Sequence, residues 1–454
     1  MNTGNPMTQQ PPDGPLVTPA ELAVRTIGAC RFDSPILDVI DSCGGAQRRL
    51  SPEVDKLLFY DTPRAARDAF GKLNEMPAFE LAGPRRKIHF NPETARAGIV
   101  TCGGLCPGLN DVIRALVMVL THRYGVTRID GFKFGYEGLN PACGHPVVPL
   151  DAEMVATIHE TGGTLLGSSR GPQDPAVMLD YLVSRNVNML FTIGGDGTQR
   201  GATAIADLAT ERGVDLSVIG IPKTIDNDIT YVEQSFGFQT AFTKAVEAIQ
   251  VAHVEAKAAA NGIGLVKLMG RHSGFIAAFA SIANADVNYC LIPEVDFPLE
   301  GPGGLLEHLH QRMLKRKHAV IVVAEGAGQK YIEAAGQDKS GNKKLGDVGL
   351  FLKDRIGAFL REKSLENTIK YIDPSYIIRG VPATPHDSVY CFRLAANAVH
   401  AAMAGKTDMI VGKWHGRYVH VPIDLAIARR QCIDPNGDLW MAVLESTGQP
   451  RWER

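Results

Sequence analysis

A lysine and two aspartates lie within six residues of one another in the stretch GIPKTIDND, residues 220–228. The stretch directly follows the apolar run of a buried strand, where Lys223, Asp226 and Asp228 raise one another's cost of desolvation. A functional reason for this cost is phosphoryl transfer, in which a general base must take a proton from the acceptor hydroxyl. A turn with a local Lys–Asp pair and an Asx-type bond at Asn227 is the structural alternative.

The chemical interpretation gives each polar residue of this stretch a role. Asp226 is the general base, and Thr224 donates a hydrogen bond to a sugar or a phosphate. Asp228 helps to hold a metal or orients its partner. Lys223 supplies positive charge to the moving group and keeps Asp226 ionised.

Two glycine-rich turns indicate phosphate binding. In TCGGLCPGLN (101–110), glycines including Gly103 let the backbone approach a ligand before a helix begins. In TIGGDGTQRG (192–201), Asp196 lies between glycines at the end of a strand, where a carboxylate beside a polyphosphate typically holds Mg²⁺. The alternative is that Asp196 caps the helix that we expect to begin at Thr198.

Basic residues occur in three other loops: Arg170 would clamp the transferring charge, whereas Arg271 and Arg379 predict binding of a second, phosphorylated ligand. Arg170 is the last residue but one of GTLLGSSRG (163–171), and Arg271 precedes a helix that we expect Ser273 to cap. KYIDPSYIIRG places Lys370, Tyr376 and Arg379 together. Each arginine alone is typical of a surface residue. Together with the glycine turns, they indicate a phosphoryl-transfer enzyme that acts on a phosphorylated acceptor.

Length and composition suit an enzyme of two to three domains. The chain has 454 residues, 45% of them hydrophobic, and a net charge of −2, which argues against nucleic acid or a membrane surface as a partner. Eight scattered cysteines are typical of reduced thiols, and no apolar run reaches the length of a membrane span. We expect a soluble, cytoplasmic protein.

The order of apolar runs predicts an α/β fold with two Rossmann-like three-layer αβα domains and mostly parallel sheets. From about residue 96, short apolar strands without alternation end in glycine-rich loops and are followed by helical stretches. Ligands then bind beyond the carboxyl ends of the strands. Residues 1–95 are expected to form an N-terminal extension with a disordered start, and SPEVDKLLFYDTPRAARDAFGKL (51–73) predicts a helix or two.

Six motifs in order, GGLCPGLN, GGDGT, PKTIDND, MGRHSG, PEVDF and YIIRG, resemble the phosphofructokinase family between about residues 96 and 430. The resemblance implies phosphate transfer from ATP, with Mg²⁺, to O1 of fructose 6-phosphate, giving fructose 1,6-bisphosphate and ADP in glycolysis. It implies a homotetramer or homodimer. It also implies a donor domain of residues 96–237 and 383–430, and a sugar-phosphate domain of residues 238–382 with the C-terminal segment 431–454.

The resemblance also distributes roles among the residues. Asp226 looks like the catalytic base and Asp196 like the magnesium residue, with Lys223, Asp228 and Arg271 as further catalytic candidates. The donor-binding positions are Gly103, Arg170, Gly171, Gly195, Asp196, Gly197 and Thr198. The sugar-phosphate positions are Thr224, Asp226, Met269, Gly270, Arg271, Glu325, Lys370, Tyr376 and Arg379, with Lys370 in place of an arginine that reaches the 6-phosphate in compact bacterial members.

The resemblance leaves the phosphoryl donor to be decided between two branches. Gly197 after GGD goes with ATP, and an aspartate there with pyrophosphate, whereas Lys223 resembles the branch that uses pyrophosphate. The combination resembles plant and trypanosomatid members, which use ATP. Gly262 departs from compact members, which have an arginine at this position, donated across a subunit interface.

Other classes remain as alternatives. GGDGT is also similar to a motif of NAD kinases and diacylglycerol kinases, which are not expected to carry PKTIDND or MGRHSG. A regulatory subunit that binds sugar phosphate without catalysis would be expected to have lost Asp226 or Asp196, and both are present.

Overall fold

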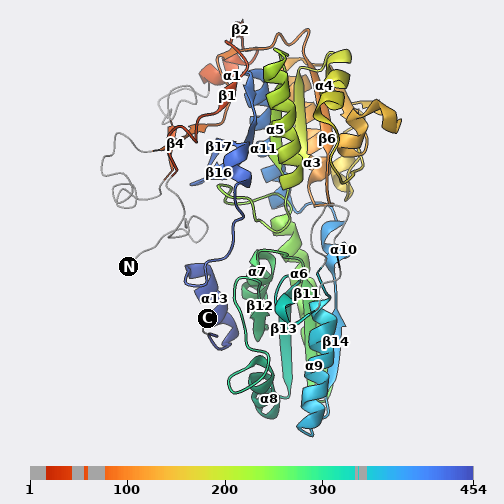
Figure 1. The fold of residues 1–454 in the computed structure, drawn as a ribbon, viewed down its shortest axis with the longest axis vertical. Helices are drawn as coiled ribbons and strands as arrows, with labels where there is room; N and C mark the ends of the chain where they lie inside the picture. Colours follow the sequence, from red (N-terminus) through yellow and green to blue (C-terminus); the bar gives the residue numbers. More distant parts are fainter. Residues whose placement is uncertain (1–16, 43–55, 60–76, 333–335, 337–344, 453–454) are drawn as a thin grey trace. The chain divides into compact units, whose positions relative to one another are not determined.

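The computed structural model describes residues 17–42, 56–59, 77–332, 336 and 345–452 (Figure 1). The expected disordered start of the extension lies outside these residues. The chain forms two compact units. Unit 1 runs to Ile225 and adds Ile229–Gly237 and Gly380–Arg429, whereas unit 2 comprises Asp226–Asp228, Phe238–Arg379 and the chain from Arg430.

A nine-stranded sheet forms the centre of unit 1, in the order β3-β4-β17-β16-β10-β9-β6-β7-β8. Its five central strands, β16, β10, β9, β6 and β7, are parallel, and antiparallel strands extend it at both edges. The bounds are β3 (Lys56–Leu58), β4 (Ala78–Leu81), β6 (Arg96–Thr101), β7 (Arg128–Phe132), β8 (Val147–Pro149), β9 (Met189–Gly194), β10 (Ser217–Pro222), β16 (Met409–Trp414) and β17 (Arg417–Pro422).

Helices cover the parallel strands of this sheet. Every residue of β9 and β10 is buried, as expected of strands with both faces covered. Helix α3 packs with α11, α4 packs with α5, and both α5 and α11 contact β10. The bounds are α3 (Leu109–Val119), α4 (Pro175–Ser184), α5 (Asp196–Glu211), α11 (Pro385–Met403) and α12 (Ile423–Ile427).

The N-terminal segment belongs partly to this sheet. β3 and β4 pair with each other, and β4 pairs with β17. The helix predicted across 51–73 is therefore wrong at Lys56–Leu58, and the rest of that range lies almost entirely outside the described residues. Two small ladders join other parts of the segment, β1 (Arg25–Thr26) with β15 (Lys406–Thr407) and β2 (Phe32–Asp33) with β5 (Lys87–Ile88). A short helix, α1 (Leu37–Ser42), follows β2.

Unit 2 has a four-stranded, wholly parallel sheet in the order β12-β13-β11-β14. Helices α6 and α7 pack together on it, and α8 and α9 pack together on its core of Ile263, Leu265 and Ile321. The bounds are β11 (Gly262–Leu268), β12 (Tyr289–Leu291), β13 (His318–Ala324), β14 (Thr368–Ile372), α6 (Phe238–Ala258), α7 (Phe275–Asn284), α8 (Leu305–Arg316), α9 (Val348–Glu362), α10 (Ser375–Arg379) and α13 (Asp438–Thr447). The two αβα units confirm the predicted fold class.

Two glycines of β11 allow α6 to approach the strand closely. A Cβ at Gly262 would lie 2.1 Å from the carbonyl oxygen of Ala256, and one at Gly264 would lie 2.6 Å from that of Ala252. Helix backbone occupies the space of any larger side chain. The departure from compact family members at Gly262 thus has a local structural reason.

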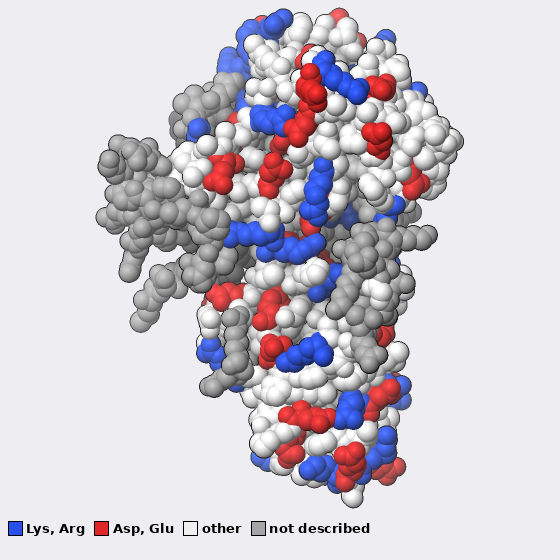
Figure 2. Space-filling view, viewed as in Figure 1, with Lys and Arg blue, Asp and Glu red and all other residues white. Residues whose placement is uncertain are grey.

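The surface carries both charges. Figure 2 shows basic and acidic side chains interspersed over the face in view, in line with the net charge of −2. No helix within the described residues combines the length and the apolar character that crossing a membrane requires.

The packing of β4 generates a stability prediction. Phe79 is fully buried and its ring lies 5.6 Å from that of Phe59 and 5.9 Å from that of Trp414. We expect Phe79→Ala to destabilise unit 1 by about 3–5 kcal/mol, because it removes apolar contacts and leaves a cavity. Thermal unfolding measures this, with Leu58→Ala, which changes an exposed residue of β3, as the control. Equal midpoints for the two variants would show that this part of the extension does not belong to the core.

Candidate active site

Four loops of unit 1 meet at the carboxyl ends of β6, β9 and β10. Gly103 N donates to Ser169 O at 3.0 Å, and Ser168 Oγ donates to Gly103 O at 2.6 Å. Lys223 joins both neighbouring turns: its backbone N donates to Gly194 O at 3.0 Å and its Nζ to Gly104 O at 2.8 Å. The predicted glycine turns therefore form one surface of backbone groups.

The GGDGT turn opens α5 with an accessible backbone. Gly195 is the N-cap, so Asp196 is the first residue of the helix and does not cap it as the structural alternative required. A Cβ at Gly197 would have no atom within 4 Å, which makes this position open space. The Thr198 side chain is buried against Gly194, where a Cβ would lie 2.1 Å from Thr198 Oγ1. This helix start presents N–H groups of the kind that bind phosphate.

Arg170 and Gly171 are exposed at the end of the loop that Ser168 and Ser169 tie to Gly103. Gly171 has a φ of 118°, a conformation that favours glycine. The structure therefore brings the Arg170 loop and the Gly103 loop together, as the motifs predict.

In unit 2, two turns lie side by side after β11 and β13. Glu325 N donates to Leu268 O at 2.9 Å, and Gly326 N donates to Gly270 O at 3.0 Å. A Cβ at Gly326 would lie 2.0 Å from Arg271 O, so the backbones are in close contact. Met269, Gly270 and Arg271 are thus held beside Glu325.

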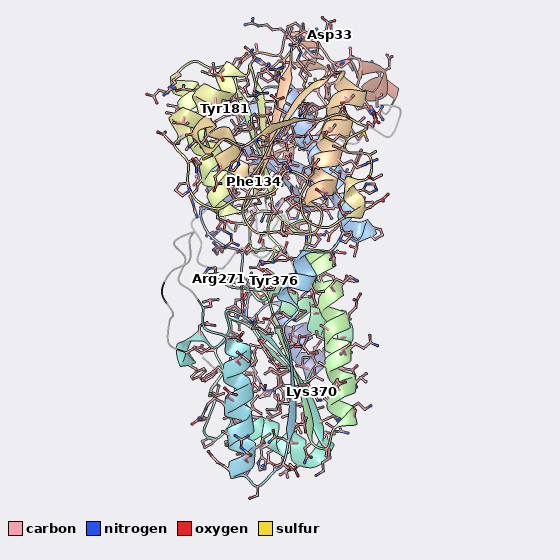
Figure 3. The ribbon with its side chains drawn as sticks, turned by 90° about the vertical axis from the view of Figure 1, so that its right-hand side faces the viewer. Asp33, Phe134, Tyr181, Arg271, Lys370 and Tyr376 are labelled. Atoms are coloured by element: carbon pink, nitrogen blue, oxygen red, sulfur yellow. The ribbon has the colours of Figure 1, made fainter. Side chains whose placement is uncertain are left out.

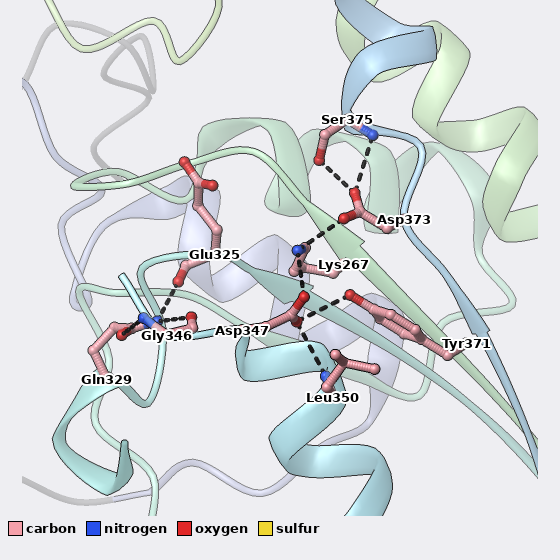
Figure 4. A network of polar contacts seen from close by, with 9 residues as sticks. All are labelled: Lys267, Glu325, Gln329, Gly346, Asp347, Leu350, Tyr371, Asp373 and Ser375. Atoms are coloured by element: carbon pink, nitrogen blue, oxygen red, sulfur yellow. Dashed lines mark hydrogen bonds and ion pairs between the residues drawn. The ribbon is translucent and has the colours of Figure 1, made fainter. Parts of the chain in front are cut away.

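Lys267 connects these turns to the start of α10 (Figure 4). Its Nζ lies 2.8 Å from Asp373 Oδ2 and 3.1 Å from Asp347 Oδ2. Burial lowers the pKa of Lys267, but the hydrogen bonds to the two aspartates have the larger effect, so the pKa is raised overall. Asp373 Oδ1 accepts from Ser375 N at 3.1 Å and from Ser375 Oγ at 2.5 Å. The network therefore fixes the beginning of the helix that carries Tyr376 and Arg379.

Charges converge on Glu325. Burial raises the pKa of its carboxyl, whereas the positive charges of Lys267, Arg271 and Arg379 lower it. The guanidinium carbon of Arg379 lies 4.6 Å from the centre of the Tyr376 ring, which is 79% exposed. Arg271, Arg379, Tyr376 and Glu325 form a polar surface suited to a phosphorylated ligand with hydroxyls. Figure 3 labels Arg271 and Tyr376 at this end of the sheet.

Lys370 does not join this group within the chain. It lies inside β14, opposite Gly264 of β11, and forms an ion pair of 3.4 Å with Glu255 of α6. Figure 3 places it further back along the strand, away from the carboxyl end. The interpretation of Lys370, Tyr376 and Arg379 as one cluster is therefore wrong. Lys370 lies two residues before the end of β14, opposite a residue of β11 that is four positions before the end of that strand, and its side chain pairs with Glu255.

Asp226 lies in a three-residue turn that belongs to unit 2. Burial is the largest cause that raises the pKa of its carboxyl, and together with the charges of Asp228 and Glu325 it brings that pKa to about 8. The prediction that Lys223 keeps Asp226 ionised is wrong, since the pKa of Asp226 is raised and not lowered. Lys223 Nζ donates to Gly104 O. Asn227 has a φ of 58°, so the turn does have the backbone conformation expected of an Asx residue.

The prediction that Ser273 caps α7 is wrong. The N-cap is Gly274, and Ser273 Oγ donates to the carbonyl oxygen of Asp226 at 3.2 Å. Glu294 takes over at the helix start, where its Oε1 accepts from Gly274 N at 2.9 Å. The serine thus fastens the Asp226 turn to unit 2.

The residues present fit a magnesium ion held through phosphate. No group of three or more His, Cys, Asp and Glu side chains gathers as a metal site anywhere in the described chain. Asp196, partly exposed in the first turn of α5, is a single carboxylate. A single carboxylate suits Mg²⁺, which keeps several waters and takes its other ligands from substrate phosphates.

Sequence reasoning missed Lys267, Asp347 and Asp373. A lysine within the apolar run GIGLVKL was a usable signal, because a charge in a buried strand needs a partner. The two aspartates lie 80 and 106 residues further along, Asp373 within KYIDPSYIIRG, and only the strand order brings that stretch to Lys267.

The raised pKa of Asp226 generates a stability prediction. The folded chain keeps the proton up to about pH 8 and the unfolded chain loses it near pH 4, so wild-type stability falls as the pH rises between these values. We expect Asp226→Asn, which cannot ionise, to be several kcal/mol, up to about 5, more stable than wild type at pH 8 and nearly equal to it at pH 4. Unfolding midpoints across this range measure the difference, with Asp354→Asn on the exposed face of α9 as the control. A destabilised Asp226→Asn at pH 8 would contradict the prediction.

Comparison with known proteins agrees with this geometry. A family model described as Phosphofructokinase matches residues 96–402. The ATP-dependent 6-phosphofructokinase of Borreliella burgdorferi is 48% identical over 95% of this chain and 97% of that protein. That of Trypanosoma brucei brucei is 48% identical over 87% of this chain and 82% of its own length.

A solved structure shares the fold. The pyrophosphate-dependent phosphofructokinase from Marinobacter aquaeolei superimposes with a TM-score of 0.64 at 18% sequence identity, covering 79% of this chain and 92% of its own. The resemblance predicted from the six motifs is confirmed: the chain belongs to the phosphofructokinase family.

Proposed function

We propose that this chain is an ATP-dependent 6-phosphofructokinase, which transfers the γ-phosphate of ATP to O1 of fructose 6-phosphate. The observation that carries the proposal is the placement of the Asp226 carboxyl in the same unit as the arginine-lined surface around Glu325. A base beside a site for a phosphorylated polyol is the arrangement that acceptor activation needs. The oligomeric state that the resemblance implies stays a prediction.

Asp226 acts on the acceptor side as the general base. A carboxyl whose pKa is raised to about 8 holds a proton more strongly than an ordinary aspartate, so its ionised form is a better base for the O1 hydroxyl. Arg271 and Arg379 bind the phosphate of the sugar, and Glu325 accepts hydrogen bonds from its hydroxyls. Met269, Gly270 and Tyr376 shape the remaining wall, and Thr224 orients the transferred group.

The loops of unit 1 act on the donor side. Gly103, Gly195 and Gly197 let the backbone approach the phosphate chain, and the start of α5 at Asp196 and Thr198 offers N–H groups to it. Arg170, beside Gly171, contributes positive charge from an exposed loop. Asp196 would hold Mg²⁺, which when bound neutralises charge on the β- and γ-phosphate oxygens.

Two features favour ATP as the donor over pyrophosphate. Gly197 leaves open space where a side chain would stand beside the phosphates. The relatives from Borreliella burgdorferi and Trypanosoma brucei brucei, each 48% identical, carry the name of the ATP-dependent enzyme. Lys223 is the feature that resembles the pyrophosphate branch. Its Nζ donates a hydrogen bond to Gly104 O in the glycine turn. It holds the donor surface together whichever donor is used.

The function is tested by offering the purified protein fructose 6-phosphate with either MgATP or pyrophosphate. We expect turnover with MgATP and at least about 100-fold less with pyrophosphate, and the reverse preference would overturn the choice of donor. Asp226→Asn should bind fructose 6-phosphate and lose about 10²–10⁴-fold in kcat, as removal of a general base does. Unchanged turnover in this variant would refute the role of Asp226 as base.

Gly197→Asp generates a separate prediction for the donor surface. The new side chain enters open space, so the variant should fold, but its carboxylate repels the phosphates of ATP. We expect the KM for ATP to rise about 10-fold or more while the KM for fructose 6-phosphate is unchanged. Gly197→Ala adds a methyl group without charge and is the matched control. A KM for ATP that rises equally in both variants would assign the effect to bulk and not to charge.

A further inference from the structure

The turn that carries Asp226 is assigned to unit 2 although the chain on both sides of it belongs to unit 1. Only three residues, Asp226–Asp228, change unit. Such a short segment has no core of its own, so its position depends on the groups that hold it. This inference rests on the proposed function, in which Asp226 is the base.

Arg430 and Gln431, the first residues of the C-terminal part of unit 2, bind this turn. Arg430 Nη1 forms a hydrogen-bonded ion pair with Asp228 Oδ2. Gln431 N donates to the carbonyl oxygen of Asp228 at 2.9 Å. The side chain of Asp228 is only 6% exposed, whereas that of Arg430 is 38% exposed, so the guanidinium reaches inward to a buried carboxylate.

The same segment is itself anchored to the body of unit 2. Ile433 N donates at 2.9 Å to Glu294 Oε1, the atom that also accepts from Gly274 N at the start of α7. Beyond α13, Gln449 makes two hydrogen bonds with the backbone of Cys290 in β12, of 2.6 and 3.2 Å. Residues 430–433 are therefore bound to Glu294 at one end and to Asp228 of the Asp226 turn at the other.

We propose that Arg430 is a positioning residue for phosphoryl transfer: it holds Asp228, and through Asp228 keeps the Asp226 carboxyl aimed at the acceptor hydroxyl. Breaking a buried ion pair from one side leaves the other charge uncompensated, so the remaining carboxylate seeks water or another cation. A shift of about 1 Å in a reacting group costs on the order of 100-fold in rate. Arg271 and Arg379, which bind the sugar phosphate under the proposed function, lie in other loops, so we expect their side chains to keep their places when Arg430 is changed.

The experiment compares Arg430→Met with Arg430→Lys in the full-length protein, with fructose 6-phosphate and MgATP. We expect kcat to fall about 10- to 100-fold in Arg430→Met, while the KM for fructose 6-phosphate changes less than about 3-fold. Arg430→Lys keeps the charge and should recover kcat to within about 5-fold of wild type. Arg451→Met, which changes an exposed arginine of the same C-terminal stretch, is the control and should leave kcat within about 2-fold.

A double variant tests whether Arg430 acts through Asp228. If it does, Arg430→Met combined with Asp228→Asn should be no slower than the slower single variant. Multiplicative losses would overturn this route. A kcat in Arg430→Met within 2-fold of wild type, or a loss that Arg430→Lys does not relieve, would overturn the proposal as a whole.

Folding is checked by circular dichroism and thermal unfolding of each variant. Arg430→Gln replaces Arg430→Met if the latter does not fold, and failure of both neutral variants would make Arg430 a residue of the fold alone and overturn the proposal. A wild-type protein without activity towards fructose 6-phosphate and MgATP would instead refute the proposed function. The two failures are thus distinguishable.

Discussion

Repulsion of the buried Asp226 carboxyl by those of Asp228 and Glu325 is a constraint that the basic residues of unit 2 must offset. Burial makes each charge more costly, and the proximity of the others raises the pKa of Asp226 further. The positive groups that surround this cluster come from every part of the unit: Lys267 from β11, Arg271 from the following turn, Arg379 from α10 and Arg430 from the last stretch. The folded unit tolerates the acids because the chain brings cations to them from positions up to 163 residues apart in sequence.

The division of the PKTIDND motif between two units has a mechanistic consequence. Lys223 is tied to the glycine turn of unit 1 through Gly104 O, whereas Asp226 is tied to unit 2 through Ser273, and Asp228 through Gln431. Within three residues, the motif therefore passes from a side chain held by unit 1 to one held by unit 2. Under the proposed function, the base is held by contacts within the same unit that carries the sugar-phosphate surface.

The sequence was informative where chemistry and backbone geometry coincide. The strands ending at Thr101, Gly194 and Leu268, and the loops after them, follow from apolar runs that stop at glycine. The contacts that the sequence did not reveal join residues that are far apart in the chain. Arg429 belongs to unit 1 and Arg430, which binds Asp228, belongs to unit 2, but nothing in the local sequence distinguishes the two. The prediction for Lys370 is wrong because it infers nearness in space from nearness in sequence.

The departure at Gly262 shows how one backbone contact limits the chemistry available to a site. Because α6 approaches β11 until only hydrogen fits between them, position 262 has no room for the long cationic side chain that compact family members have there. Lys370, two residues beyond the partner of Gly262 on β14, extends to Glu255 on the same helix. Helix α6 thus excludes one cation and engages another, so under the proposed function Arg271 and Arg379 are the cations of this chain that remain for the phosphate of the acceptor. The close packing of a helix on a strand, more than the composition of any loop, decides which cations serve the site.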